Sequence, residues 1–207
     1  MHWSSVESVV SRMLDVVAAL TLAVVAFPVV LVVAVLVKGT SRGPVLYKQE
    51  RMGAGGVPFT MYKFRTMRVG TDVEIRSDPQ QWAAFEAVAF KLPADDPRIT
   101  RVGRWLRASS LDELPQLLNV LEGNMSAVGI RPVEPEQLQT RPADYRAVYG
   151  SRRPGITGLW QVEGRLSGDE ERRLEFDRRY IDDWSIRGDL ALLARTPLAV
   201  LRVRRPA

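Results

Sequence analysis

The chain has 207 residues and a hydrophobic content of 46%, enough for one catalytic unit and one membrane element but not for two full domains, and too apolar for general disorder. It has no cysteine and one histidine, His2, which excludes disulfides, zinc–thiolate centres and cysteine nucleophiles and disfavours a serine–histidine triad or a multi-histidine metal site. The net charge of +5 favours an anionic partner, and nucleic acid, anionic lipid and phosphate-bearing substrates all satisfy it.

Residues 16–37 carry no charge and would be about 33 Å long as a helix, the thickness of a bilayer core. Their length favours a membrane segment over a buried soluble helix or a cleaved signal peptide. Pro28 lies inside the run and predicts a kink or a break, so a re-entrant pair of half-helices and a kinked spanning helix both stay open. Basic residues follow the segment and place the rest of the chain on the cytoplasmic side; they are Lys38, Arg42, Lys48 and Arg51.

Residues 43–67 are typical of a β-hairpin, with strands at 45–49 and 59–67 joined by a glycine-rich turn at 53–56. The period of two places Lys63 and Arg65 on one face of the second strand. The two cations are either solubilising edge charges or part of a site for anions.

Residues 71–95 are expected to be a loop with a short helix around 82–90. The next stretch, residues 97–108, has helical periodicity that gathers three arginines within about 120° of arc; they are Arg101, Arg104 and Arg107. Such a basic face suits an anionic membrane surface or phosphates, and a solvated surface is the alternative.

Residues 109–123 are predicted to form one helix, because Ser110 and Glu113 make a capping-box pattern and Gly123 is a natural stop. Its leucines share one apolar face, with Asp112 and Glu113 turned away from the core. Carboxylates in a first turn complement the helix dipole without any catalytic role, so the pair alone leaves a structural and a catalytic interpretation open.

Farther on, residues 125–128 suggest a short strand followed by a turn that carries Arg131. Residues 133–150 are polar and predicted to be a surface helix, and residues 153–165 predict another turn and strand. Two helices are expected in residues 170–203, separated near 184–188, and the basic, leucine-rich end of the second could rest on a bilayer.

Long stretches in a fixed order resemble the bacterial sugar transferase family, the monotopic polyprenyl-phosphate phosphoglycosyl transferases. They cover nearly the whole chain and read RGPVLYKQERMG, PFTMYKFRTM, DPRITRVGRWLRASSLDELPQLLNVLEGNMSAVGIRP, RPGITGLWQVEGR and FDRRYIDDWSIRGDL. The chain departs from the family pattern at Ile130, where proline is common, and at Leu166, where asparagine is frequent.

The resemblance implies an α+β fold with a re-entrant membrane helix in residues 1–40, broken near Pro28, and a cytoplasmic catalytic domain with membrane-surface helices in residues 41–207. It implies transfer of a sugar-1-phosphate from a nucleotide sugar, typically a UDP sugar, to polyprenyl (undecaprenyl) phosphate at the bacterial inner membrane, which starts glycoconjugate or exopolysaccharide assembly. Membrane lipids are expected partners, nucleic acid is not, and a homodimer stays open.

The resemblance also assigns residues. Asp112 would be the nucleophile that forms an aspartyl phosphosugar, and Glu113, with a share from Asp112, would bind Mg²⁺. The cations expected to bind substrate phosphates are Lys63, Arg65, Arg107, Arg131 and Arg165.

Elementary electrostatics agrees with this assignment. A carboxylate with an unperturbed pKa near 4 is ionised at neutral pH and needs no general base. Its difficulty is repulsion, because two unit negative charges 4 Å apart cost about 4 kcal/mol at an effective dielectric of 20. Arginines, a helix N-terminus and Mg²⁺ would offset that repulsion.

Three other interpretations compete. A membrane-tethered basic module for nucleic acid or anionic lipid would use the arginines but leave the carboxylate pair unexplained. A conventional glycosyltransferase would release a nucleoside diphosphate rather than a monophosphate, and the chain has no Asp-x-Asp motif. A catalytically inactive family member is disfavoured because both carboxylates and the nearby cations are present.

Overall fold

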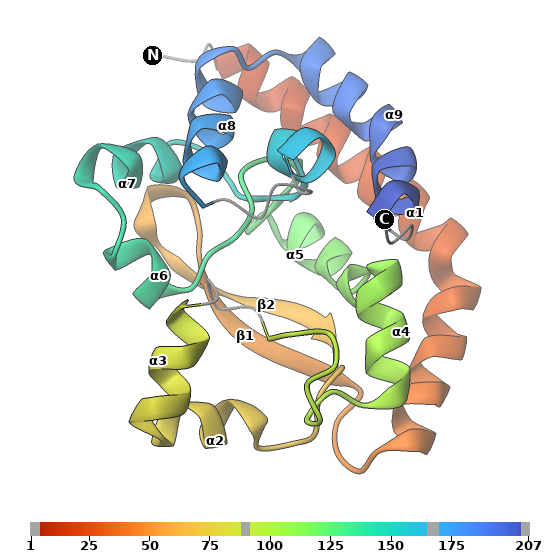
Figure 1. Cartoon of the computed structure of the whole chain (residues 1–207). Coiled ribbons are helices and arrows are strands. Elements are labelled where there is room, and N and C mark those ends of the chain that lie inside the picture. The colour runs from red at the N-terminus through yellow and green to blue at the C-terminus, as the bar shows by residue number, and fades with distance from the viewer. Residues whose placement is uncertain (1–4, 88–91, 165–169, 204–207) are drawn as a thin grey trace.

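The computed structural model describes residues 5–87, 92–164 and 170–203, and Figure 1 shows their arrangement. Helices predominate and the strands form small two-stranded sheets, so the predicted α+β class is confirmed. The helices are α1 (Ser5–Thr40), α2 (Thr71–Ser77), α3 (Pro79–Ala87), α4 (Arg101–Ser109), α5 (Gln116–Glu122), α6 (Pro135–Gln139), α7 (Ala143–Gly150), α8 (Glu170–Asp182) and α9 (Ile186–Val203). The strands are β1 (Leu46–Met52), β2 (Pro58–Phe64), β3 (Ser126–Val128) and β4 (Gly155–Thr157), and short helical turns occur at η1 (Ala54–Gly56), η2 (Leu111–Glu113) and η3 (Trp160–Gly164).

Helix α1 passes through Pro28 as one continuous helix and curves along its length, so it is not broken into two half-helices (Figure 1). One stripe of α1, with residues four or seven positions apart, is buried against the rest of the protein; it comprises Ser11, Asp15, Ala19, Ala26, Val33 and Val37. The other side exposes large apolar side chains, including Val24 and Val25. Only 17% of its most apolar window is buried, so α1 is not a soluble core helix and suits a membrane segment.

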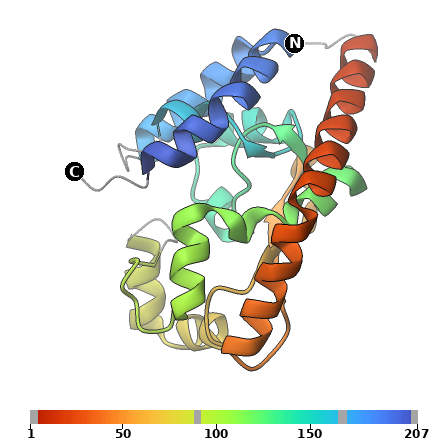
Figure 2. The same ribbon diagram turned by 90° about the vertical axis from the view of Figure 1, so that its right-hand side faces the viewer.

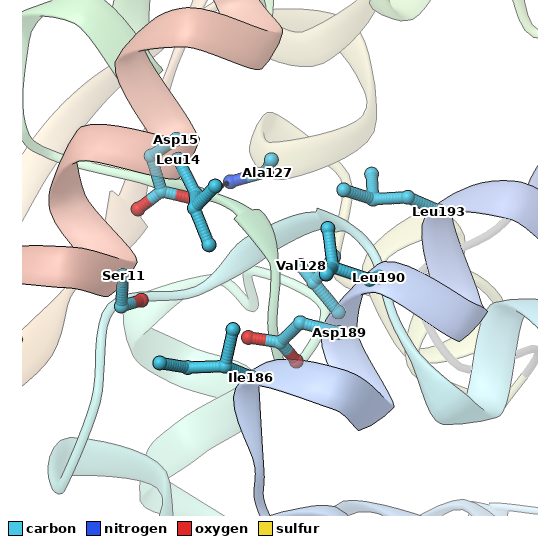
Figure 3. A pocket seen from close by; sticks show the side chains of 9 residues that line it. All are labelled: Ser11, Leu14, Asp15, Ala127, Val128, Ile186, Asp189, Leu190 and Leu193. Carbon is cyan, nitrogen blue, oxygen red and sulfur yellow. Dashed lines mark hydrogen bonds between the residues drawn. The ribbon is translucent and has the colours of Figure 1, made fainter. Parts of the chain in front are cut away.

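Polar contacts fasten the N-terminal half of α1 to β3 and α5. Arg12 donates from Nη1 to the carbonyl oxygen of Val120 at 2.6 Å, near the end of α5, where helix carbonyls lack partners of their own. Asp15 accepts from the hydroxyl of Ser126 at 2.7 Å and from the backbone N–H of Ala127 at 2.8 Å, and Figure 3 shows Asp15 beside Ala127. The membrane helix is therefore docked directly on the strand that precedes the Arg131 turn.

The C-terminal end of α1 is tied to the same globular unit. Arg65 donates from Nη2 to the carbonyl oxygens of Val37 at 3.3 Å and Ser41 at 2.8 Å, and from Nη1 to that of Pro44. Arg12 and Val37 are about 38 Å apart along a straight helix. Contacts at both ends make α1 lie alongside the globular part, along one edge of the molecule (Figure 2).

We expect Asp15→Ala to lower the free energy of unfolding by about 3 kcal/mol, measured by chemical denaturation in detergent micelles. The substitution removes the buried acceptor of Ser126 and Ala127 and leaves the Arg153 guanidinium, 3.5 Å from the Asp15 carboxylate, without this counter-charge. Ser8→Ala, at an exposed position of the same helix, is the matched control and should leave stability unchanged. Equal stability of the two variants would show that the Asp15 contacts do not dock α1.

The hairpin predicted in residues 43–67 is confirmed as β1 and β2, which pair antiparallel. Tyr47 lies opposite Lys63, and Arg51 lies opposite Phe59. Directly opposite residues of an antiparallel pair share a face, so Lys63 and Arg51 project to the same side of the hairpin.

Helix α5 covers this side of the hairpin and is fixed to it by Asn119, which is fully buried. Its Nδ2 donates to the carbonyl oxygen of Thr60 at 2.7 Å, and its Oδ1 accepts from the backbone N–H of Tyr62 at 3.0 Å. A core cluster surrounds the contact and includes Ala19, Met61, Leu117, Val120 and Met125. Because Asn119 belongs to α5 and its side chain bonds the backbone of β2, it fixes the start of α5, and the turn before it, relative to β2.

The prediction of one helix over residues 109–123 is wrong. Helix α4 runs to Ser109, and the chain then passes through Ser110 at φ 58°, turn η2 and Pro115 before α5 begins. Ser110 closes α4 in the left-handed conformation, and an N-cap residue needs an extended one, so the predicted capping box with Glu113 does not form.

Two further predictions need correction. The surface helix expected in residues 133–150 is instead the pair α6 and α7, and it buries Tyr145 and Tyr149 in the main core with α8 and α9. In residues 71–95, where a loop with one short helix was expected, α2 and α3 occupy residues 71–87 and leave little loop among the described positions. The two predicted C-terminal helices are confirmed as α8 and α9.

Strands β3 and β4 pair in parallel and position the turn that follows β3. Their backbones approach so closely that a Cβ on Gly155 would lie 2.0 Å from the backbone nitrogen of Gly129. Glycine at both positions therefore allows the contact from which the chain reaches Arg131 two residues later.

Candidate active site

Asp112 and Glu113 lie in η2, a 3₁₀ turn between α4 and α5. Asp112 is only 9% exposed, so it faces inward, contrary to its predicted position away from the core. The reason is the left-handed residue Ser110, which turns the chain so that η2 faces β2 rather than continuing α4.

Two cations from separate elements converge on Glu113. Lys63 of β2 places its Nζ 3.7 Å from Glu113 Oε1, and Arg131, after β3, places both terminal nitrogens 3.4 Å from the same oxygen. Burial lowers the pKa of Lys63, while Glu113 opposes that shift. The predicted approach of Lys63 and Arg131 to the carboxylate pair thus occurs in the structure.

Arg107, in the last turn of α4, is the third predicted cation near Asp112. Its Nη2 donates to the carbonyl oxygen of Leu92 at 3.4 Å, and burial lowers its pKa against the raising effect of Asp112. Its Nη1 is buried and has no hydrogen-bond acceptor within the described ranges. Arg107 therefore keeps a donor available for a ligand.

The electrostatics of Asp112 differ from those of an ordinary carboxylate. Burial, and then the charge of Glu113, raise the pKa of Asp112 to about 6, although Lys63, Arg107 and Arg131 act in the opposite direction. The expectation of an unperturbed value near 4 is therefore corrected. Asp112 is still mostly ionised at neutral pH, and a further cation nearby would stabilise its buried negative charge.

The other two predicted phosphate-binding cations do not join this cluster. The guanidinium of Arg65 is engaged by backbone carbonyls at the end of α1, so its position indicates a structural role in docking that helix. The period of two assigns Arg65 to the Lys63 face, but β2 ends at Phe64, so the alternation of the strand does not extend to the Arg65 side chain. Arg165 lies outside the described residues.

Sequence reasoning missed two residues of the site. A small pocket beside Glu113 is lined by Arg51 and Gln116 in addition to Lys63 and Arg131. Arg51 lies on the Lys63 face because the turn covers five residues, 53–57, so that Arg51 is opposite Phe59; the predicted turn at 53–56 would place Arg51 on the other face. Gln116 is the buried first residue of α5 and lines the pocket, a position that the helical pattern of the sequence does not show.

A second cavity, between α1, β3 and α9, does not have the character of a phosphate site (Figure 3). Leu14, Leu190 and other mostly apolar groups line it. Its two carboxylates are already engaged, Asp15 by β3 and Asp189 by hydrogen bonds from Tyr180 at 3.0 Å and Trp184 at 2.8 Å. Their negative charge would repel a phosphate.

The carboxylate pair fits a magnesium ion. Mg²⁺ is usually held by one or two carboxylates together with waters and substrate phosphates, and Asp112 and Glu113 are two adjacent carboxylates at one turn. The raised pKa of Asp112 reflects a negative charge that a divalent cation would stabilise. No larger group of metal-binding side chains occurs in the described part of the chain.

The apolar helix and the carboxylate pair with cations beside it are together typical of a membrane-attached protein whose site suits phosphate-bearing substrates. The model of the bacterial sugar transferase family matches residues 6–203, and the chain belongs to that family.

Several relatives are similar over most of this chain. An undecaprenyl-phosphate galactose phosphotransferase of Salmonella typhimurium is 41% identical over 196 residues, 92% of this chain and 40% of the relative. A UDP-glucose:undecaprenyl-phosphate glucose-1-phosphate transferase of Caulobacter vibrioides is 42% identical over 92% of this chain and 69% of the relative. An exopolysaccharide production protein of Rhizobium meliloti is 41% identical over 91% of this chain and 84% of the relative. The chain thus spans about 40% of the first relative and most of the last.

Proposed function

We propose that the protein transfers a sugar-1-phosphate from a UDP sugar to undecaprenyl phosphate, giving an undecaprenyl-diphosphate sugar and UMP. The observation that carries the proposal is the buried Asp112, next to Glu113 and within reach of the charges of Lys63, Arg107 and Arg131. Family membership and the names of the relatives supply the substrate classes. The name of the Rhizobium relative supports a role in starting exopolysaccharide assembly.

The first step forms a covalent intermediate. A carboxylate oxygen of Asp112 attacks the sugar-bearing phosphorus of the donor, and the bond from that phosphorus to the oxygen bridging the two phosphates breaks. That oxygen keeps the electron pair and leaves as part of UMP. No general base is needed, because Asp112 attacks in its ionised form.

The second step regenerates the carboxylate. A phosphate oxygen of undecaprenyl phosphate attacks the phosphorus of the aspartyl phosphosugar, and the bond from phosphorus to Asp112 breaks. The product is the undecaprenyl-diphosphate sugar. Because UMP can leave before the lipid reacts, the water-soluble and the lipid-embedded substrate need not be bound together.

The cations around Asp112 have distinct positions for this chemistry. Arg107 approaches from α4 with a buried donor that has no acceptor among the described residues and could bind a phosphate oxygen, whereas Lys63 and Arg131 approach from the Glu113 side. Asp112 and Glu113 would hold Mg²⁺, which supplies charge neutralisation of the phosphates when bound. Fixed positive groups stabilise negative charge that develops on the phosphoryl oxygens.

The proposal is tested by a panel of nucleotide sugars presented with undecaprenyl phosphate in detergent micelles. Release of nucleoside monophosphate, matched by a lipid-linked diphosphate sugar, is the expected result. Release of nucleoside diphosphate would instead identify a conventional glycosyltransferase.

We also propose that both ends of α1 lie on the cytoplasmic side of the inner membrane. The support is geometric: Arg12 and Val37, near the two ends of the apolar stretch, contact the same globular unit. A straight span would place these contact regions at opposite membrane faces, about 38 Å apart, and draw the polar globular part into the lipid. Basic residues after the apolar run favour the cytoplasmic face.

This topology predicts that cysteines at positions 4 and 77 are both protected from a membrane-impermeant thiol reagent added to the periplasmic side. The chain has no native cysteine, so Ser4→Cys and Ser77→Cys can each be labelled without background. Both should react once the inner membrane is opened. Periplasmic labelling of Ser4→Cys alone would show that α1 spans the membrane.

The raised pKa of Asp112 predicts an acid limb in the first step. Only the ionised carboxylate attacks, and bound Mg²⁺ would lower its pKa, so at subsaturating Mg²⁺ single-turnover release of UMP should rise with pH through a midpoint near 6 and level off above it. The rate at pH 5 is expected to be about tenfold below the plateau. Glu113→Gln removes a charge that raises this pKa, so the midpoint should move to lower pH. A rate independent of pH from about 5 to 7.5 would contradict the assignment of Asp112.

A further inference from the structure

The pocket beside Glu113 contains more positive than negative charge. Arg51, Lys63 and Arg131 line it, and Glu113 is the carboxylate among its lining residues. Glu113 already pairs with Lys63 at 3.7 Å and with Arg131 at 3.4 Å. Since charge interactions are strong where water is largely excluded, this surplus favours an anionic ligand.

Arg51 is poised for such a ligand. Its side chain is 12% exposed, and its Nη2 donates to Gln49 Oε1 at 2.7 Å. Its Nε–H is buried and meets no acceptor among the residues that the structure describes. Burial lowers the pKa of Arg51 to about 10, against the raising effect of Glu134, so the guanidinium stays charged at neutral pH. A buried donor without an acceptor is costly, and a ligand oxygen would satisfy it.

Glu134 lies close enough to orient Arg51 but does not fully neutralise the positive charge of the Arg51 guanidinium. Its carboxylate is 2% exposed and accepts from Arg76 at 2.8 Å and from Gln49 at 2.9 Å, whereas Arg51 Nη1 is farther away, at 3.4 Å. Arg76 therefore makes the closer ion pair, and it does not line the pocket. Its side chain is 45% exposed, so Arg76 offers a control that shares the Glu134 contact but not the pocket.

We propose that Arg51 binds a substrate phosphate together with Lys63 and Arg131, a role that rests on the proposed function and adds a residue to its site. A guanidinium with an unused N–H matches the oxygens of a phosphate. Two phosphates of the reaction present this chemistry in turn, that of the UMP leaving group and that of the undecaprenyl phosphate acceptor.

Binding is tested first with inorganic pyrophosphate, by thermal unfolding of the full chain in detergent micelles. Wild type and Arg76→Met should be stabilised by pyrophosphate to a similar extent, and Arg51→Met should lose the stabilisation. Arg51→Lys keeps the charge but not the Nε–H, so it should retain part of the effect; it also serves if Arg51→Met fails to fold. Equal stabilisation of wild type and both Arg51 variants would overturn the proposal. So would an equal loss in Arg76→Met, because the effect would then act through Glu134.

Two reactions then identify the phosphate. One is exchange of labelled UMP into a UDP sugar without lipid, and the other is complete transfer to undecaprenyl phosphate. A fall of about 10- to 100-fold in both for Arg51→Met, with Arg76→Met near wild type, assigns Arg51 to the leaving phosphate. Normal exchange with a similar fall in complete transfer assigns it to the acceptor. Wild-type rates in both reactions would exclude either role.

The binding and activity results separate this inference from the proposed function. Pyrophosphate binding that depends on Arg51, in a wild-type protein that releases no nucleoside monophosphate, would refute the proposed function and leave the anion site in place. Normal sugar-phosphate transfer by Arg51→Met, with unchanged pyrophosphate binding, would refute the Arg51 site alone.

Discussion

Replacing Asp112 with asparagine is expected to lower sugar-phosphate transfer at least about 1000-fold, because the amide cannot form the aspartyl phosphosugar. The substitution is nearly isosteric and removes a buried, incompletely compensated charge, so the fold should be retained or slightly stabilised. The measurement is formation of lipid-linked diphosphate sugar from a UDP sugar, with the melting temperature as the control for folding.

Asp183→Asn is the matched control for this prediction, since its carboxylate is 77% exposed at the end of α8 and lies far along the chain from η2. It should transfer sugar phosphate at the wild-type rate. If Asp112→Asn kept a tenth or more of wild-type activity, a direct attack by the lipid phosphate would replace the covalent mechanism.

Replacing Arg131 with alanine is expected to reduce kcat/KM by about 100-fold, or about 2.7 kcal/mol of transition-state stabilisation. Arg131 places two nitrogens 3.4 Å from Glu113 Oε1 and keeps 36% of its side chain exposed, so it can reach a phosphate while orienting the carboxylate. Its loss also removes a positive charge that stabilises ionised Asp112. The pKa of Asp112 should therefore rise, moving the acid limb of UMP release to higher pH.

That shift of the acid limb distinguishes an electrostatic role of Arg131 from a purely structural one. Arg179→Ala provides the comparison, because Arg179 is 64% exposed and pairs only loosely with Asp183 at 3.9 Å. We expect no change in kcat/KM or in the pH profile of Arg179→Ala. Near-normal turnover of Arg131→Ala would show that Arg131 is a surface charge and that the site has been assigned wrongly.

Local patterns predicted those parts of the fold that local interactions determine. The glycine turn and alternating side chains of residues 43–67 suffice to specify the β1–β2 hairpin. Arg131 was placed correctly after β3, because a short apolar run followed by glycine and proline indicates the end of a strand and a turn. The same reasoning placed Lys63, whose face follows from the period of two.

Other features depend on tertiary contacts that periodicity does not contain. Most of residues 109–123 are helical, as their pattern predicts, but Ser110 ends α4 in a left-handed conformation and separates it from α5. This change of chain direction turns Asp112 inward. Arg65 lies two residues after Lys63, so strand alternation predicts it to be in the same site, yet its guanidinium donates hydrogen bonds to carbonyl oxygens at the end of α1. Tyr145 and Tyr149 lie in a polar segment whose burial depends on α8 and α9.

The covalent role of Asp112 is tested most directly by isotope exchange in the absence of lipid. Wild-type protein, mixed with a UDP sugar, Mg²⁺ and labelled UMP but no polyprenyl phosphate, should incorporate label into the UDP sugar, and mass spectrometry should find a phosphosugar on Asp112. Asp112→Asn should show neither signal. Normal transfer to lipid by the wild type, without exchange and without an adduct on Asp112 even when free UMP is in excess, would contradict the proposed mechanism.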